Sequence, residues 1–207
     1  MDPKWLTWAR QLAALAQNGL TYSESQYEIE RYERIRQIAA EMMAAGSDRD
    51  PGSFLELFSR ERGYATPKVD VRGAVFRDDR ILLVREKLDG GWTLPGGWAD
   101  PCQSPAEAVA REVFEESGFE VRVAKLAAVY DRSKHPHKPP MPFHLYKLFF
   151  LCEITGGSAA ESHETTGVEF FAEDRIPEPL SISRTLPFQI ARMFEHHRDP
   201  ALPTDFD

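Results

Sequence analysis

The chain has 207 residues, of which 42% are hydrophobic and 28% are charged, and its formal net charge at pH 7 is -8. This composition is ordinary for a folded globular protein, and the length suits one large domain or one domain with an appendage. The negative charge argues against a surface devoted to long nucleic acid, because phosphate binding normally needs a basic footprint. An anionic ligand would therefore have to be bound locally, by a metal ion and a few cations.

No run in the sequence approaches 18 uninterrupted apolar residues, and the N-terminus lacks the pattern of a secretory signal. We therefore expect no membrane association and a cytoplasmic location. The two cysteines, Cys102 and Cys152, are too few to indicate a zinc site or a disulfide framework. We expect both to be reduced thiols.

Residues 1–64 have the apolar periodicity of helices. A first helix is predicted from Trp5 onward and ends at Asn18-Gly19. Residues 23–26 have the form of a capping box, which predicts the start of a second helix that ends at Gly46. A polar loop over 47–52 then leads into a short third helix.

Two or three short helices seldom bury a large apolar stripe by themselves, so these helices should dock on the rest of the chain or on a second subunit. We expect a homodimer whose interface is formed mostly by residues 1–64. The side chains expected at this interface are Trp5, Trp8, Leu12, Ile35, Ile38 and Met42.

From residue 65 to residue 207 the period changes to that of strands with two helices. Strands are predicted at 69–76, 81–84, 120–130, 143–154 and 167–172, and a closing helix is predicted at 186–197. The loop over 131–142, with four prolines and two histidines, is expected to lie outside the core. The segment from Asp199 is expected to be frayed.

A helix with one strongly acidic side is predicted between residues 104 and 118. Ser104 and Glu107 form a capping box around Pro105, and Gly118 supplies the stop. The expected core face holds Ala106, Val109, Ala110, Val113 and Ser117, and the opposite face holds Glu112, Glu115 and Glu116.

Three glutamates at this spacing repel one another, so an isolated cluster mildly destabilises its helix. A hard cation bound by the glutamates would make the cluster stabilising. Oxygen-only ligands on one rigid element suit Mg²⁺ or Mn²⁺. The glycine pair at Gly96-Gly97, just before the helix, would let the backbone approach a ligand closely.

The segment from Gly97 to Phe119 resembles the Nudix box, G-x5-E-x7-R-E-U-x-E-E-x-G-U, at eight of its nine fixed positions. The exception is Gln103, where the family has glutamate. The resemblance implies an α/β fold, an α/β/α sandwich with a mixed sheet, over residues 65–207. Residues 1–64, the small all-helical region in front of it, resemble a subgroup that hydrolyses nucleoside diphosphates linked to another group, such as CDP-choline or ADP-ribose.

The resemblance also implies roles for individual residues. Glu112 and Glu116 are expected to hold the metal ion, with a carbonyl oxygen of Gly96 or Gly97. Glu115 is expected to hold a second ion or to act as a base, and Arg111 to orient a carboxylate. A general base in the loop before the last strand is also expected, with Glu164 as the first candidate and Glu161 as the second.

Other residues are candidates for contact with the substrate. Arg85 or Lys87 would neutralise the terminal phosphate, and Trp92 would either stack on a base or pack against Pro95. The cations and imidazoles of the rigid loop suit a phosphate or a sugar, although each can also be an ordinary solvated loop residue. Those loop residues are Lys134, His135 and His137.

Three functional hypotheses follow from these residues. The first is metal-dependent hydrolysis of the pyrophosphate bond in a nucleoside diphosphate linked to a small group, with release of a nucleoside monophosphate. The second is hydrolysis of nucleoside triphosphates or of the 5′ end of RNA. The third, suggested by Gln103, is a nucleotide-binding regulatory module without turnover, although such a module would not need the costly glutamate cluster.

Overall fold

The structure, a computed structural model, describes residues 2–207. The chain divides into two compact units. The first runs to Pro67 and also includes the short segment Pro140–His144, which comes from the middle of the second unit. The second unit comprises Lys68–Pro139 and Leu145–Asp207.

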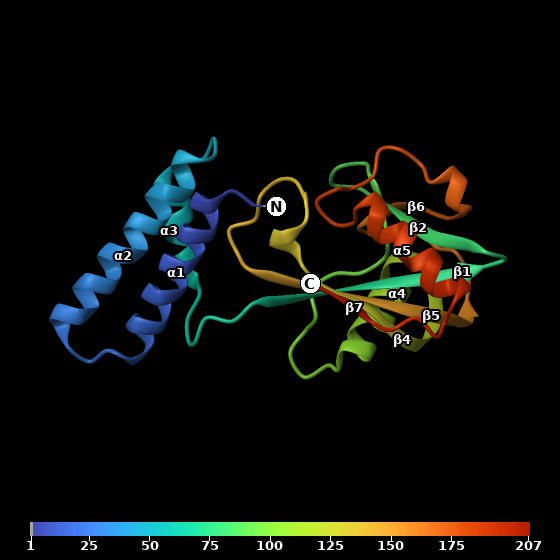
Figure 1. The fold of residues 1–207 in the computed structure, drawn as a ribbon, viewed down its shortest axis with the longest axis horizontal. Helices are drawn as coiled ribbons and strands as arrows, with labels where there is room; N and C mark the ends of the chain where they lie inside the picture. Colours follow the sequence, from blue (N-terminus) through green and yellow to red (C-terminus); the bar gives the residue numbers. More distant parts are fainter. Residues whose placement is uncertain (1) are drawn as a thin grey trace. The chain divides into compact units, whose positions relative to one another are not determined.

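The first unit is built from three helices, α1 (Lys4–Tyr22), α2 (Gln26–Ala45) and α3 (Pro51–Arg60), which lie alongside one another in Figure 1. Several core positions are alanines, and their small side chains allow the helices to approach one another closely. The buried core consists of Leu6, Ala9, Ala39, Ala40, Met43, Phe54 and Phe58.

The segment Pro140–His144 joins this core although it lies far from the helices in sequence. The Arg10 guanidinium donates to the Met141 carbonyl oxygen, 2.9 Å from Nε, and Phe143 packs against the helical core. Sequence periodicity did not indicate this long-range contact, because the segment reads locally as a loop followed by a strand.

The ends of the helices differ from the prediction in three places. Helix α1 continues through Asn18-Gly19 to Tyr22, because Gly19 packs directly against the ring of Tyr32 on α2. Helix α2 begins at Gln26, the last residue of the expected box, with no side-chain cap from Ser25. Helix α3 begins at Pro51, inside the expected loop.

The side chains expected at a dimer interface fall into two groups. Trp8 is 55% exposed and Ile38 is 36% exposed, so both are accessible on the surface of the helical unit. Trp5, Leu12 and Met42 pack against the core of that unit. The exposed apolar face of α1 is therefore formed by Trp8, Leu15 and Tyr22, which recur every seven residues.

The second unit is a mixed sheet with the strand order β3-β2-β1-β5-β4-β7, to which β6 is added by pairing with β2. Strands β1 and β5 are parallel, as are β4 and β7, and the other pairs are antiparallel. The bounds are β1 (Lys68–Arg77), β2 (Arg80–Glu86), β3 (Trp92–Thr93), β4 (Phe119–Asp131), β5 (Leu145–Gly157), β6 (Thr165–Phe171) and β7 (Asp205–Phe206).

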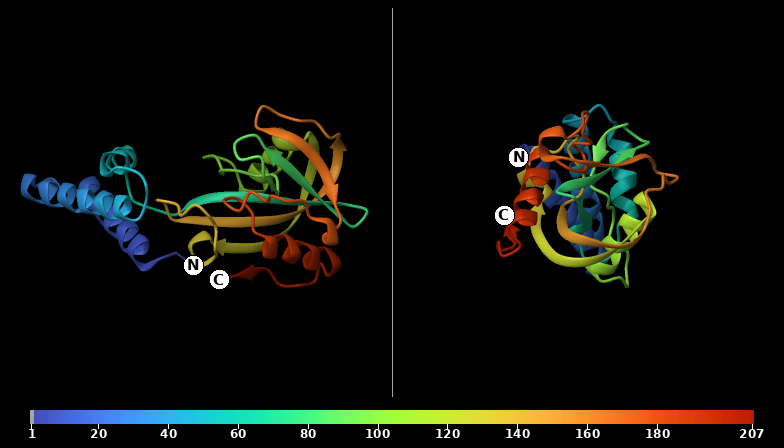
Figure 2. Two further views of the ribbon diagram at one scale, coloured as in Figure 1. Left: turned by 90° about the horizontal axis from the view of Figure 1, so that it is seen from above. Right: turned by 90° about the vertical axis from the view of Figure 1, so that its right-hand side faces the viewer.

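Helix α4 (Pro105–Ser117) packs on one face of this sheet and α5 (Pro187–Arg198) on the other, as Figure 2 shows. Alternate strand residues supply the two cores, because side chains in a strand point to opposite faces. Val71 and Val75 meet α4, whereas Ala74 meets α5. The expected α/β/α sandwich with a mixed sheet is confirmed.

Two expectations about the second unit are wrong. The segment after Asp199 is not frayed, because β7 pairs with β4 and Arg192 forms an ion pair with Asp205. The loop over 131–142 is not outside the core, because Arg132 is 5% exposed and His137 is 4% exposed. None of the helices between residues 2 and 207 has the length and the apolar run that would be needed to span a bilayer.

A Gly19→Ala substitution should destabilise the helical unit. Alanine normally favours a helix over glycine by about 1 kcal/mol, but a Cβ here would lie 2.4 Å from the Tyr32 ring. Overpacking of this kind costs about 1–3 kcal/mol, so thermal unfolding followed by circular dichroism should show a lower Tm. The double variant Gly19→Ala/Tyr32→Ala is the control, because it removes the clash. A single variant as stable as the wild type would contradict this packing.

Candidate active site

The acidic helix α4 is fixed at both ends by local sequence. The Ser104 side chain accepts the Glu107 N–H at 3.2 Å, and the Glu107 carboxylate accepts the Ser104 N–H at 2.8 Å. Gly118 adopts the left-handed conformation, with φ of 76°, that ends the helix. These predicted caps are confirmed. Within the helix Ala106 is exposed and Ala108 is buried in its place, which corrects the expected core face.

The loop between β3 and α4 passes so close to the sheet at Gly96 that a larger residue does not fit there. Gly96 has a φ of 145°, and a Cβ there would lie 2.0 Å from the Val71 carbonyl oxygen. A Cβ on Gly97 would lie 2.7 Å from a carboxylate oxygen of Glu112. The glycine pair therefore brings the loop backbone against the acidic helix, as the sequence predicted.

Glu116 lies at the centre of the site and is only 3% exposed. One of its oxygens accepts the Gly96 N–H at 2.8 Å, which ties the loop to the helix. Burial raises the pKa of this carboxyl to about 7, although Arg72 and the Gly96 hydrogen bond act in the opposite direction. Glu116 lies on the face opposite the expected core, yet it is not open to solvent, because the loop covers it.

Arg111 connects the other two glutamates of the box. Its guanidinium lies 3.0 Å from the Glu112 carboxylate, 2.7 Å from Glu115 and 3.1 Å from Asp100. Its Nε donates to the Gln103 side-chain oxygen at 3.2 Å. Arg111 thus makes the contacts that an orienting role requires, and Gln103 faces this arginine. Burial raises the pKa of Glu112, against the effect of Arg111.

A cleft of about 420 Å³ opens beside α4 and contains five carboxylates and two guanidinium groups. Glu164, the expected base, lines this cleft together with the three helix glutamates, and its carboxylate pairs with His163 at 3.0 Å. The lining residues are Gly97, Trp98, Asp100, Arg111, Glu112, Glu115, Glu116, Ser162, His163, Glu164 and Arg184.

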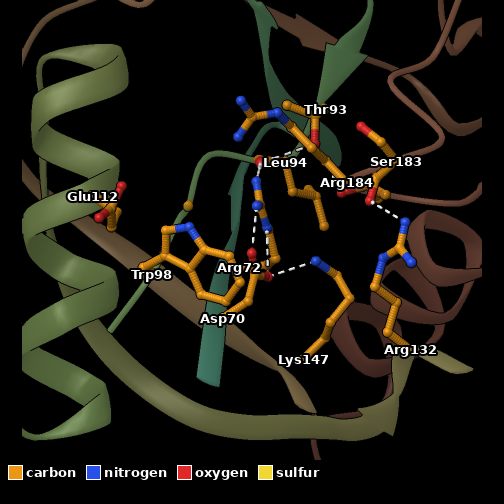
Figure 3. A network of polar contacts seen from close by, with 12 residues as sticks. Asp70, Arg72, Thr93, Leu94, Trp98, Glu112, Arg132, Lys147, Ser183 and Arg184 are labelled. Atoms are coloured by element: carbon orange, nitrogen blue, oxygen red, sulfur yellow. Dashed lines mark hydrogen bonds and ion pairs between the residues drawn. The ribbon is translucent and has the colours of Figure 1, made fainter. Parts of the chain in front are cut away.

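A buried ionic network supports the site from the sheet, as Figure 3 shows. Asp70 accepts from Arg72 Nε at 2.9 Å and from Lys147 Nζ at 2.6 Å, and Arg72 also donates to the Leu94 carbonyl oxygen at 3.1 Å. Burial alone would raise the pKa of Asp70, but the charges of Arg72 and Lys147 outweigh it and lower the pKa to about 2.

Our interpretation of the sequence missed this network and a second buried pair. Glu86 is 2% exposed and forms an ion pair with Arg184 at 3.0 Å. A signal was present for Lys147, which interrupts an otherwise apolar strand, whereas Asp70 and Arg72 alternate with valines as the polar residues of a half-exposed strand do. No local pattern marks Arg184, which lies in the loop before α5.

The expected substrate contacts lie outside the lining of this cleft. Arg85 is exposed and donates to the Gly90 carbonyl oxygen at 3.0 Å. The Trp92 ring packs edge to face on Phe171, with ring centroids 4.9 Å apart, and the residue is half-buried. Lys134 is exposed, and His135 pairs with Asp207 at 2.9 Å.

His137 is a core residue rather than a substrate contact. Its Nδ1 donates to the Ile182 carbonyl oxygen at 2.9 Å. Burial lowers the pKa of the imidazole to about 3, although this hydrogen bond acts in the opposite direction. The neutral ring therefore fastens the 131–142 loop to the segment before α5.

Comparison with known proteins agrees with this geometry. A family model described as the NUDIX domain matches residues 66–188, more than half of the chain, and one described as a UDP-X-like, N-terminal oligomerisation domain matches residues 3–58. The chain is 48% identical to YjhB of Bacillus subtilis strain 168, named provisionally as an ADP-ribose pyrophosphatase, over all of its length and 99% of that protein.

Two solved structures are also similar. A crystal structure of UDP-X diphosphatase matches with a TM-score of 0.63 and 30% identity, over 99% of this chain and 98% of its own. An ADP-ribose pyrophosphatase from Streptococcus suis 89-1591 matches with a TM-score of 0.60 and 36% identity, over 69% of this chain and all of its own.

The chain belongs to the Nudix hydrolase family and carries the N-terminal domain of its UDP-X-like members. Within the family it is similar to ADP-ribose pyrophosphatases. This membership favours an enzyme over the binding-module hypothesis.

Lowering the pH should reduce the free energy of unfolding of the wild-type protein more than that of a His137→Gln variant. An unfolded histidine has its ordinary pKa of about 6.5, so below that pH the unfolded chain binds a proton that the folded state excludes. The stability that neutral His137 contributes is complete above this pH and is lost as the pH falls towards 3. Between pH 6.5 and 5 the loss amounts to as much as about 2 kcal/mol.

Urea unfolding of the wild type and His137→Gln at both pH values measures this difference. His163→Gln is the control, because the His163 side chain is 86% exposed. An equal acid loss in the wild type and in His137→Gln would show that His137 does not carry the effect.

Proposed function

We propose that the chain hydrolyses the pyrophosphate bond of a nucleoside diphosphate linked to a small group and releases a nucleoside monophosphate and a phosphorylated fragment. The observation that carries this proposal is the cleft in which Glu112, Glu115, Glu116 and Glu164 converge. Such a concentration of carboxylates repels a diphosphate unless cations are bound with it, and metal-assisted phosphoryl chemistry supplies that condition.

ADP-ribose is the first candidate substrate, and CDP-choline belongs to the same chemical type. ADP-ribose is supported by the names of two relatives, at 48% and 36% identity. The name of the UDP-X diphosphatase, at 30% identity, supports the same linkage with another base. All of these molecules share a diphosphate between a nucleoside and a second group, and the cleft is proposed to bind that shared part.

The residues at the cleft fit Mg²⁺ or Mn²⁺ by the chemistry of their donors. Glu112 and Glu116 supply carboxylate oxygens, Glu115 lies one turn from Arg111, and Gly97 has a carbonyl oxygen that accepts the Val71 N–H. A buried carboxyl with a raised pKa, such as Glu116, is stabilised in its charged form by a cation. When bound, such ions neutralise phosphoryl oxygens and lower the pKa of a water molecule.

In the described chain no three acidic, histidine or cysteine groups already stand in a metal-ligand arrangement. The reason is visible in the contacts, because Arg111 holds Glu112 and Glu115 while the Gly96 N–H holds Glu116. We propose that Arg111 keeps these carboxylates oriented towards the cleft and exchanges part of its contact with them when substrate binds.

Glu164 is proposed to take the proton from the attacking water. Its backbone is fixed, because its carbonyl oxygen accepts the Lys87 N–H at 2.9 Å, while its carboxylate lies in the cleft at the side of His163. A carboxylate that is partly exposed can accept a proton and release it to solvent, as a general base must.

Glu116→Gln should abolish most of the turnover without unfolding the protein. Glutamine can still accept the Gly96 N–H, but it lacks the charge that holds a metal ion. Changes to residues around a metal ligand typically lower activity about 10–100-fold, and loss of the ligand itself should lower turnover further. The rate of ADP-ribose cleavage at saturating Mg²⁺ measures this loss, and ³¹P NMR identifies the products. CDP-choline, a UDP-sugar and nucleoside triphosphates are tested as substrates in parallel.

Glu107→Gln is the matched control on the same helix, because glutamine also closes a capping box. It should turn over at the wild-type rate. A wild type that leaves every compound of the panel intact would contradict the proposed function, and a Glu116→Gln variant with normal turnover would contradict the role of Glu116.

We further propose that the N-terminal unit forms a homodimer through the exposed face of α1, which consists of Trp8, Leu15 and Tyr22. These side chains are 55%, 60% and 69% exposed, and a row of large apolar side chains in water is typical of an interface. The match of residues 3–58 to an oligomerisation domain supports the proposal.

The double variant Trp8→Glu/Leu15→Glu should be monomeric in light scattering, because two charges would be buried at the interface. Its helical content should not change, since neither side chain belongs to the buried core of the helices. Tyr27→Glu, a change at a 77% exposed residue of α2, is the control. A double variant with the mass of a dimer would place the interface elsewhere.

A further inference from the structure

A diphosphate in the cleft needs positive charge from the protein as well as from metal ions, and the cleft offers two arginines. Arg111 is surrounded by Glu112, Glu115 and Asp100, all within 3.1 Å. Its charge is thus already matched by carboxylates. Arg184 is different, since its one ion-pair partner among residues 2–207 is Glu86.

The cations that the sequence suggested for this role are engaged elsewhere. Arg85 donates to the Gly90 carbonyl oxygen at 3.0 Å. The Lys87 ammonium donates to the carbonyl oxygens of Ser162 and His163, at 2.8 and 3.1 Å. Neither residue lines the cleft, whereas Arg184 does.

Glu86 is the buried ion-pair partner of Arg184. The Glu86 side chain is 2% exposed, and one of its oxygens lies 3.0 Å from the Arg184 guanidinium. Its other oxygen has no hydrogen-bond partner within the described chain, so this arginine is the main compensation for a buried carboxylate. The ion pair with this buried carboxylate keeps the Arg184 guanidinium at the wall of the cleft.

The backbone around Arg184 is also firmly placed. The Thr185 hydroxyl lies 2.9 Å from the Thr93 hydroxyl, and the Ser181 N–H donates to the Trp92 carbonyl oxygen at 2.9 Å. Figure 3 shows the Arg184 side chain extending past Thr93 and Leu94 towards the side on which α4 carries Glu112. The guanidinium is therefore presented from the wall opposite the acidic helix.

We propose that Arg184 binds the non-bridging oxygens of the substrate's diphosphate, and that Glu86 is a positioning residue for its guanidinium. A planar guanidinium suits this task, because it can donate two parallel hydrogen bonds to a phosphate. This assignment rests on the proposed function only in requiring that the ligand carry a diphosphate.

Binding of methylenediphosphonate with Mg²⁺, measured by isothermal titration calorimetry on the full-length protein, tests the assignment without turnover. This probe keeps the two phosphorus groups and has no base, sugar or hydrolysable bridge. Arg184→Gln should raise its Kd about 10-fold to 100-fold, the cost of a lost hydrogen bond between charged groups. Arg184→Lys should recover part of that loss.

The variants must be separated from general damage to the fold. Arg184→Gln leaves Glu86 buried without its cation, so the double variant Arg184→Gln/Glu86→Gln keeps the interior neutral and serves if the single variant unfolds. Arg122→Ala is the matched control, because that arginine is exposed and pairs with Glu153 on the surface. It should bind the probe as the wild type does.

Glu86→Gln distinguishes positioning from mere support. It should raise Kd for the probe and KM for ADP-ribose, with a smaller change in kcat and in Tm. Equal binding by the wild type and the Arg184 variants, or no binding by the wild type, would overturn the assignment. Arg184-dependent binding with no hydrolysis of any compound would uphold it and reject the proposed function.

Discussion

The carboxylate of Glu116 is held almost entirely out of water, and the rest of the site is arranged around that burial. Its hydrogen bond from the Gly96 N–H fastens the glycine loop to α4, and the loop in turn excludes solvent from the carboxylate. A buried negative charge is costly unless it is matched. The site is thus prepared for a cation, because burial of Glu116 outweighs the compensation that Arg72 and the Gly96 N–H provide.

The buried network of Asp70, Arg72 and Lys147 makes this arrangement rigid. Arg72 reaches the Leu94 carbonyl oxygen and so holds the start of the loop, while its charge also stabilises Glu116. Buried ion pairs add little net stability, because desolvation consumes most of their attraction. Here these ion pairs fix the position of the loop. The loop is anchored from below by Arg72 and from the side by Glu116.

Local sequence predicted the parts of the site that local physics determines. The caps at Ser104 and Gly118 set the ends of α4, and the helical spacing puts Glu112 beside Gly97 and Glu116 beside Gly96. Long-range pairing determines the remainder. Asp70 meets Lys147 because β1 and β5 pair in parallel with these two residues in register, and no periodicity reveals a register between strands so far apart. The same limit applies to Arg184 with Glu86, to Gly19 against Tyr32 and to β7, whose partner strand lies far upstream.

The most direct test of the central claim is where a metal ion binds. Crystals soaked in Mn²⁺ with methylenediphosphonate, measured at a wavelength where manganese scatters anomalously, would locate it without assumptions about turnover. Our account predicts an anomalous peak within coordination distance of the Glu112 and Glu116 carboxylates, with the probe's oxygens between the ion and the opposite wall. A fully occupied manganese site elsewhere in the chain, with Glu112 still held by Arg111 and Glu116 by the Gly96 N–H, would contradict it.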